Sequence, residues 1–254
     1  MHVDILGTVT VSTDGRPTPV AANKVRAMLA TLALNVRQAI SYEELADELW
    51  SGQDLGNIRN ALQAHAARLR KILDPPADRA AGRTALRTVH NGYLLDISAE
   101  QVDGNRFLDL AARGAAALPS RPEQALELLT EALRLWRGPA LLDAGDGLRC
   151  RAAAALFDER RLTVREDLIS ARLAIGDQRH TVPDLQQLVA QYPLRERFCE
   201  LLMLALYRSG RQGEALELFH RTRHRLDAEL GLRPGHALQR RYAEIITQDP
   251  ALAS

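Results

Sequence analysis

The fold is decided by residues 41–73, which read SYEELADELW, SGQDLGNIRN, ALQAHAARLR and KIL in order. Ser41 and Glu44 have the spacing of a capping box, in which each side chain accepts a hydrogen bond from the backbone amide of the other residue. A helix is therefore predicted to begin at Ser41 and to end at Ser51-Gly52. The side chains expected to face inward are Tyr42, Leu45, Ala46 and Leu49.

A second helix is predicted from about Gly56 to Leu73. It stops at Asp74-Pro75-Pro76, because proline lacks an amide donor and clashes with the preceding turn. At 100° per residue, a set of apolar side chains shares one face, with His65 at its margin. They are Ile58, Leu62, Leu69 and Leu73. The opposite face carries Asn57, Asn60, Ala64, Ala67 and Lys71, flanked by Gln63 and Arg68.

Short β segments are predicted on both sides of these helices. Before them, apolar residues alternate from Val3 to Val11, and Asp14-Gly15 is a strong hairpin signal. After them, residues 85–96 read as two β segments joined by Asn91-Gly92, a preferred type I′ turn pair. Between the first hairpin and Ser41, a further helix starts at Lys24. Its apolar face is Val25, Met28, Leu29, Leu32 and Val36.

Two helices followed by a hairpin can place the second helix in the major groove of DNA and the hairpin near the minor groove. The helix that ends at Leu73 is therefore the candidate reader. Its outward amides can pair with adenine edges, its arginine with guanine or a phosphate, and its alanine methyls allow close approach to thymine. These residues are Asn57, Asn60 and Gln63, then Arg68, then Ala64 and Ala67. The same face could also be merely the solvated side of an amphipathic helix.

Other residues are expected to position the protein on DNA without reading sequence. Arg59, Arg70 and Lys71 are candidate phosphate contacts on the reader helix. Lys24 and Arg26 stand at a helix start, where basic side chains oppose the helix dipole, which suggests an external anion. On the second hairpin, Arg87, Thr88, His90 and Asn91 could reach the backbone or the minor groove.

The charge distribution agrees with a surface that faces a polyanion. The whole chain is nearly balanced, with 33 Lys and Arg against 32 Asp and Glu. Residues 41–54 contain five acidic residues and no Lys or Arg, whereas residues 55–94 contain seven basic residues and two acidic ones, a net charge of +5. Such segregation is typical of nucleic-acid-binding domains.

Beyond Asp103 the composition indicates helices almost throughout, so a domain boundary is predicted at residues 98–102. Superimposing Gly176 on Gly210 aligns apolar positions at an offset of 34 residues, the tetratricopeptide period. Residues 121–133 resemble one more second helix of such a unit. The expected fold is mainly α with small antiparallel β: a winged helix-turn-helix domain at residues 1–98, then an all-α, tetratricopeptide-like domain at residues 99–254.

No pattern in the sequence supports an enzyme, a cofactor or a metal site. Cys150 and Cys199 are far apart and are expected to be buried, reduced thiols. His220 and His224 have the spacing of a metal pair, but they lack an intervening glutamate and fit a solvated helix face better. Phosphate-loop and nucleophile-elbow motifs are absent. Without a signal peptide or a long apolar run, the chain is expected to be cytoplasmic and away from membranes.

Several short motifs in a fixed order resemble the Streptomyces antibiotic regulatory protein family. In the first half they are Ile5-Leu-Gly7, Lys24-x-Arg26, Leu45-x-x-Glu-Leu-Trp50, Ala61-Leu-Gln63, Arg68-Leu-Arg-Lys71 and Gly92-Tyr-Leu94. In the second half they are Asp103-x-x-Arg-Phe107, Leu135-Trp-Arg-Gly138, Tyr192-Pro-Leu-Arg-Glu196, Leu206-Tyr-Arg-x-Gly-Arg211 and Glu229-Leu-Gly-Leu-Arg-Pro234. The second set is similar to that family's bacterial transcriptional activation domain.

This resemblance implies an OmpR-type winged helix joined to a tetratricopeptide-like activation domain. It implies binding to direct repeats in double-stranded promoter DNA of antibiotic or secondary-metabolite genes, with a homodimer on tandem repeats as one arrangement. It also implies recruitment of RNA polymerase holoenzyme with its sigma factor. The reader helix of the family corresponds to residues 56–73. Receiver, ATPase and sensor domains are not expected. The chain would share the DNA-binding fold of two-component phosphorelay regulators but would act without their receiver domain.

A second hypothesis is a helical-repeat adaptor or signalling regulator whose winged helix binds protein. Salt-sensitive retention on promoter DNA, lost on competition by a specific sequence, distinguishes the two.

Overall fold

The computed structural model describes residues 1–13, 16–50, 57–74 and 84–252. Their contacts form two compact units, residues 1–111 with 131–162, and residues 112–130 with 163–254. Helices dominate both units, with two small antiparallel sheets in the first, as the sequence predicts. Among the described residues, no helix combines the length and apolarity needed to span a membrane.

The chain begins with an antiparallel sheet of β1 (His2–Asp4), β2 (Thr10–Thr13) and β3 (Arg16–Pro19), in that order. Thr13 pairs with Arg16, and the predicted turn residues Asp14-Gly15 lie outside the described residues. Helix α1 (Asn23–Ala33) follows and buries Val25, Met28, Leu29 and Leu32 as expected. It ends at Ala33, so Val36 lies beyond it.

The helix-turn-helix consists of α2 (Tyr42–Trp50) and α3 (Ile58–Leu73). The capping box is present: the Ser41 amide donates to Glu44 Oε2 at 2.9 Å, and the Glu44 amide donates to Ser41 Oγ at 3.1 Å. Helix α3 ends at Leu73, as predicted; Ser51-Gly52 and the two prolines lie outside the described residues. Its buried side chains are Leu62, Ala66, Leu69 and Leu73, while Ile58 is half-buried.

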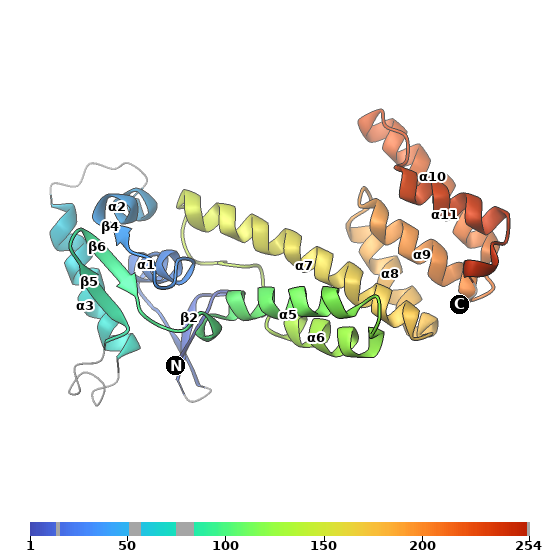
Figure 1. The fold of residues 1–254 in the computed structure, drawn as a ribbon. Coiled ribbons are helices and arrows are strands. Elements are labelled where there is room, and N and C mark those ends of the chain that lie inside the picture. Colours follow the sequence, from blue (N-terminus) through green and yellow to red (C-terminus); the bar gives the residue numbers. More distant parts are fainter. Residues whose placement is uncertain (14–15, 51–56, 75–83, 253–254) are drawn as a thin grey trace. The chain divides into compact units, whose positions relative to one another are not determined.

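The second sheet contains β4 (Ile40–Ser41), β5 (Leu86–Val89) and β6 (Gly92–Leu95) in the order β4-β6-β5. The hairpin of β5 and β6, here called the wing, lies beside α3 (Figure 1). The predicted turn is wrong by one residue. Val89 pairs with Gly92, so His90 and Asn91 form the turn, and neither has a positive φ.

Gly92 is needed for a close approach rather than for the turn. An added Cβ would lie 1.9 Å from the carbonyl oxygen of Ile40 on the neighbouring β4. Glycine therefore lets β4 and β6 pair, and this pairing attaches the wing to the start of α2.

The first unit does not stop at the predicted boundary of residues 98–102. After the short 3₁₀ helix η1 (Ala99–Gln101), α5 (Asp103–Ala117) begins with a buried carboxylate. Asp103 accepts hydrogen bonds from the amides of Ile5 at 2.6 Å and Leu6 at 3.1 Å, and from Arg137 Nη2 at 2.9 Å. Residues 1–98 alone therefore lack the groups that bond the amides of Ile5 and Leu6, just after β1, and the compact unit extends to residues 1–111 and 131–162.

A second buried carboxylate joins α2 to α7 (Leu148–Ala174). Glu48, 5% exposed, accepts from the amides of Arg149 at 2.9 Å and Cys150 at 2.8 Å. These amides belong to the first turn of α7, where they have no partner within the helix. A Cβ on Gly147 would lie 2.2 Å from the Glu48 carboxylate, so glycine leaves the space that this contact requires.

The remaining helices repeat a simple hairpin arrangement. They are α6 (Pro122–Arg134), α8 (Gln178–Gln191), α9 (Glu196–Arg208), α10 (Gln212–Leu230) and α11 (His236–Ile246), followed by the 3₁₀ helix η2 (Pro250–Leu252). Gly176 and Gly210 both adopt a left-handed conformation, with φ of 82° and 75°. Each stands between two helices, and the equivalent Ala171 and Ala205 are fully buried. The predicted 34-residue repeat is confirmed.

Both cysteines are free and buried, as predicted. Burial raises the pKa of the Cys150 thiol to about 12, and it raises the pKa of the Cys199 thiol as well.

We predict that Gly92→Ala destabilises the first unit, because the new methyl group cannot share space with the Ile40 carbonyl. Overpacking of this kind costs about 1 to 3 kcal/mol. Gly213→Ala is the matched control, since nothing lies within 4 Å of its added Cβ. Thermal unfolding followed by circular dichroism should show a lower melting temperature for Gly92→Ala alone. Equal melting temperatures would contradict the close-approach role.

Candidate DNA-binding surface

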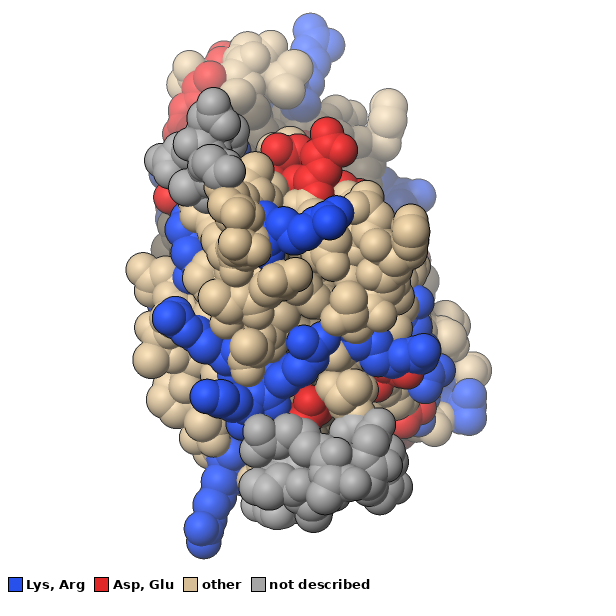
Figure 2. Space-filling view, turned by 90° about the vertical axis from the view of Figure 1, so that its left-hand side faces the viewer, with Lys and Arg blue, Asp and Glu red and all other residues tan. Residues whose placement is uncertain are grey.

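The outward face of α3 has the composition that a reader helix needs. Asn60, Gln63, Ala64, Ala67, Arg68 and Lys71 are all exposed, as the periodicity predicts. Within the described part of the chain, the side chains of Asn60, Gln63, Arg68 and Lys71 have no hydrogen bond or ion pair. Their donors and acceptors are therefore available to an external ligand. Figure 2 views this side of the molecule and shows Lys and Arg side chains spread across the face, with fewer carboxylates between them.

Asn57 and Arg59 occupy the first turn of α3 and also serve the domain itself. Asn57 is the N-cap: its Oδ1 accepts from the Asn60 amide at 3.1 Å. The structure therefore gives Asn57 a capping role, and its expected reading role stays a prediction. The Arg59 guanidinium lies over the Tyr42 ring, 5.1 Å from its centroid, and stays exposed.

Arg70 connects the reader helix to the wing. Its Nε donates to the Leu86 carbonyl at 3.0 Å, and its Nη2 donates to Thr88 Oγ1 at 2.7 Å. The guanidinium also lies over the buried Tyr93 ring, 5.8 Å from the centroid. Arg70 therefore has a positioning role, with Thr88 as a partner, and its expected phosphate contact stays a prediction.

Lys24 and Arg26 at the start of α1 are both bonded to groups of the protein itself. Lys24 Nζ donates to the Leu49 carbonyl at the end of α2. Arg26 donates to the carbonyls of Val20 at 2.7 Å and Asp143 at 3.0 Å, and it forms an ion pair with the Asp143 carboxylate at 3.1 Å. Only 16% of the Arg26 side chain is exposed, so it is a structural arginine.

The tip of the wing remains open to a ligand. His90 and Asn91 are exposed, and the Asn91 carbonyl accepts from the Tyr42 amide at 3.0 Å, which fixes the turn against the start of α2. Arg87 forms an exposed ion pair with Asp96 at 3.1 Å. Such a pair contributes little to stability and can open when a phosphate competes for the guanidinium.

His65 and Trp50 form a stacked pair at the inner margin of α3, with ring centroids 5.8 Å apart. Burial lowers the pKa of His65, and the positive charges of Arg68 and Lys24 lower it further. The imidazole is thus held neutral at physiological pH beside the basic face. Sequence periodicity placed His65 at this margin, but it gave no sign of the contact with Trp50.

The sequence also gave no indication of the role of Glu48, which it presents as one of several acidic residues before the reader helix. A helical wheel places Glu48 on the side of Glu44 and Leu45 without showing which groups meet it. Its partners come from residues about 100 positions later, and only the folded chain reveals them.

Comparisons with known proteins agree with this architecture. Residues 19–95 match the family described as transcriptional regulatory protein, C terminal, and residues 102–246 match the bacterial transcriptional activator domain. The transcriptional regulator RedD of Streptomyces coelicolor is 57% identical over 254 residues, which covers 99% of this chain and 72% of RedD. The regulatory protein DnrI of Streptomyces peucetius is 32% identical over 256 residues, covering 99% of this chain and 94% of DnrI.

Among solved structures, Mycobacterium tuberculosis EmbR in complex with a low-affinity phosphopeptide matches with a TM-score of 0.91 and 29% identity. The match covers 99% of this chain and 68% of the EmbR chain. Fold and relatives together define the class: a transcriptional activator with an OmpR-type winged-helix DNA-binding domain and a helical activator domain. Within this class, the chain belongs to the Streptomyces antibiotic regulatory protein family.

We predict that Arg70→Ala destabilises the protein, because it removes two hydrogen bonds from a charged donor to the wing. Each such bond contributes about 1.5 to 3 kcal/mol, less where solvent reaches it. Arg68→Ala, two residues away and exposed without a partner among the described residues, should change stability by less than about 0.5 kcal/mol. Urea unfolding of both variants measures the difference; equal stability would show that Arg70 does not hold the wing.

Proposed function

We propose that this protein binds promoter DNA with the exposed face of α3 and the tip of the wing. The supporting observation is that some of its basic side chains are bonded within the protein, whereas other basic and amide side chains are exposed. Lys24, Arg26 and Arg70 are bonded within the protein, whereas Asn60, Gln63, Arg68 and Lys71 are exposed along one helix. The polar groups of this face have no partner within the described part of the protein, and neighbouring elements hold the helix in place. Such a face suits recognition of base edges and phosphates.

In this proposal Asn60 and Gln63 read adenine edges, Arg68 addresses guanine or a phosphate, and Ala64 and Ala67 allow contact with thymine methyl groups. Lys71 and Arg59 bind phosphates, and Arg87, His90 and Asn91 bring the wing to the backbone or the minor groove. The target would be direct repeats upstream of antibiotic or other secondary-metabolite genes, in keeping with the family to which RedD and DnrI belong.

We further propose that the helical domain at residues 99–254 recruits RNA polymerase holoenzyme, including its sigma factor. Stacked helical hairpins offer an extended surface for protein contacts. The protein would act in the cytoplasm, where its promoters lie, and without catalytic activity of its own.

Asn60 and Lys71 allow reading to be separated from anchoring. Asn60 offers a donor and an acceptor in one plane, whereas Lys71 offers a point charge without an acceptor. Asn60→Ala should cost about 1 to 3 kcal/mol at one operator position and relax discrimination there. Lys71→Ala should weaken binding to all sequences alike and reduce the salt-dependence slope by about one.

The measurement is a titration of both variants against the operator and its single-base mutants at several salt concentrations. Arg240→Ala serves as a control, because this exposed arginine lies on α11, far along the chain from the winged helix. If base preference and salt slope both stay unchanged, α3 does not dock this face in the groove. Failure to bind any promoter would favour the adaptor hypothesis.

Binding to tandem direct repeats predicts a dependence on helical phase. Two copies that contact each other on DNA require their sites to lie on the same side of the duplex, about 10 to 10.5 base pairs apart or a multiple of this. Inserting about five base pairs between the repeats should therefore abolish cooperative binding and activation in a purified transcription system, whereas inserting about ten should largely retain them. Equal activity with both insertions would exclude contact between neighbouring copies.

A further inference from the structure

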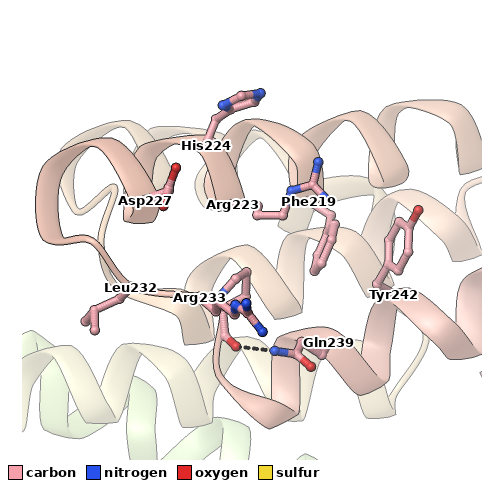
Figure 3. A pocket seen from close by; sticks show the side chains of 9 residues that line it. Phe219, Arg223, His224, Asp227, Leu232, Arg233, Gln239 and Tyr242 are labelled. Carbon is pink, nitrogen blue, oxygen red and sulfur yellow. Dashed lines mark hydrogen bonds between the residues drawn. The ribbon is translucent and has the colours of Figure 1, made fainter.

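A cavity of about 680 Å³ lies between α10, α11 and the residues that connect them (Figure 3). This volume falls within the range of sites that hold small organic molecules, about 300 to 1,000 Å³. The cavity belongs entirely to the second unit, and the winged helix contributes no residue to it. DNA recognition as proposed above gives it no role.

An aromatic pair lines one part of the cavity. Phe219 of α10 and Tyr242 of α11 stack with their ring centroids 4.1 Å apart and their planes 20° from parallel. His220 Nε2 lies 3.4 Å from the Tyr242 hydroxyl, which holds the tyrosine ring in place. The pair offers apolar, polarisable surface to a ring that enters the cavity.

Two arginines from different elements also line the cavity: Arg223 on α10 and Arg233 in the connection to α11. Neither has an ion pair within the described part of the chain. Their neighbours differ, because Arg221 pairs with Glu217 at 3.6 Å and Arg225 pairs with Glu229 at 3.4 Å. Arg223 and Arg233 thus line the cavity without an ion pair among the described residues, although Asp227 lines it as well.

The connecting segment holds Arg233 in a defined backbone position. Gly231 ends α10 in the left-handed conformation, with φ of 65°, and the Leu232 amide donates to the Leu226 carbonyl at 3.2 Å. On the other side, Gln239 Nε2 donates to the Pro234 carbonyl at 2.5 Å, the bond drawn in Figure 3. A ligand would meet a preformed loop and would not have to order it.

We propose that this cavity binds a small planar aromatic anion, such as an aromatic carboxylate. Guanidinium groups bind carboxylates through paired, charge-assisted hydrogen bonds, and the stacked rings accommodate an aromatic skeleton. Asp227, which also lines the cavity, repels any anion, so the charges of both arginines and the contact with Phe219 and Tyr242 have to outweigh it. The helical domain would then carry a small-molecule site in addition to its contacts with the transcription machinery.

The test uses the full chain and two probes of the same shape, 2-naphthoate and the uncharged 2-naphthamide, titrated by isothermal calorimetry. We expect one naphthoate per chain and binding of the amide weaker by at least about tenfold, since it lacks the charge that the guanidinium groups recognise. Arg223→Gln and Arg233→Gln should each weaken naphthoate binding by about tenfold. Arg221→Gln, which alters a paired arginine on the same helix, should leave it unchanged.

Inorganic phosphate and acetate test the aromatic requirement, and melting temperatures of the variants show whether each remains folded. The proposal is overturned by equal binding of naphthoate and naphthamide, by unchanged affinity in the folded double variant Arg223→Gln and Arg233→Gln, or by no binding of naphthoate at millimolar concentration. Acetate or phosphate binding as tightly as naphthoate would show a plain anion site and would overturn it too.

Discussion

The buried carboxylate of Glu48 is the interaction on which the arrangement of the winged helix depends. A charge in the interior is costly unless hydrogen bonds replace its water, and the first turn of α7 supplies two amides for this purpose. Arg149, whose amide is one of the two, also forms an ion pair with Glu44 of the capping box. One connected set of groups therefore holds the start of α2, its buried end and the first turn of α7. Helix α3 packs against α2 and so depends on the same contacts.

The local features of the fold could be predicted from sequence because their causes lie within a few residues. Ser41 and Glu44 are three positions apart, the buried face of α3 follows from helical periodicity, and Gly176 and Gly210 mark turns through their own backbone conformation. The exposed face of α3 follows from the same periodicity. What a periodic pattern cannot show is whether an outward donor already has a partner.

The features that the sequence does not indicate concern residues whose partners are distant in the chain. Arg26 meets Asp143, Arg70 meets Leu86 and Thr88, and nothing near either arginine in sequence indicates this. Gly92 is a further example. The Asn91-Gly92 pair suggests a turn, but the glycine is needed because a side chain there would clash with the Ile40 carbonyl on another strand. The predicted boundary at residues 98–102 separates two family matches, whereas Asp103, Arg137 and the start of α7 complete the first unit from beyond it.

The cysteines have a consequence for redox chemistry. Cys150 follows directly on the helix start that Glu48 caps, and its sulfur lies 3.8 Å from the Thr31 hydroxyl; Cys199 accepts a hydrogen bond from Thr222 at 3.4 Å. Oxidants and electrophiles attack the thiolate, and a pKa of about 12 for Cys150 leaves almost none of it at neutral pH. While the protein stays folded, burial and the raised pKa therefore make Cys150 a poor target for peroxide.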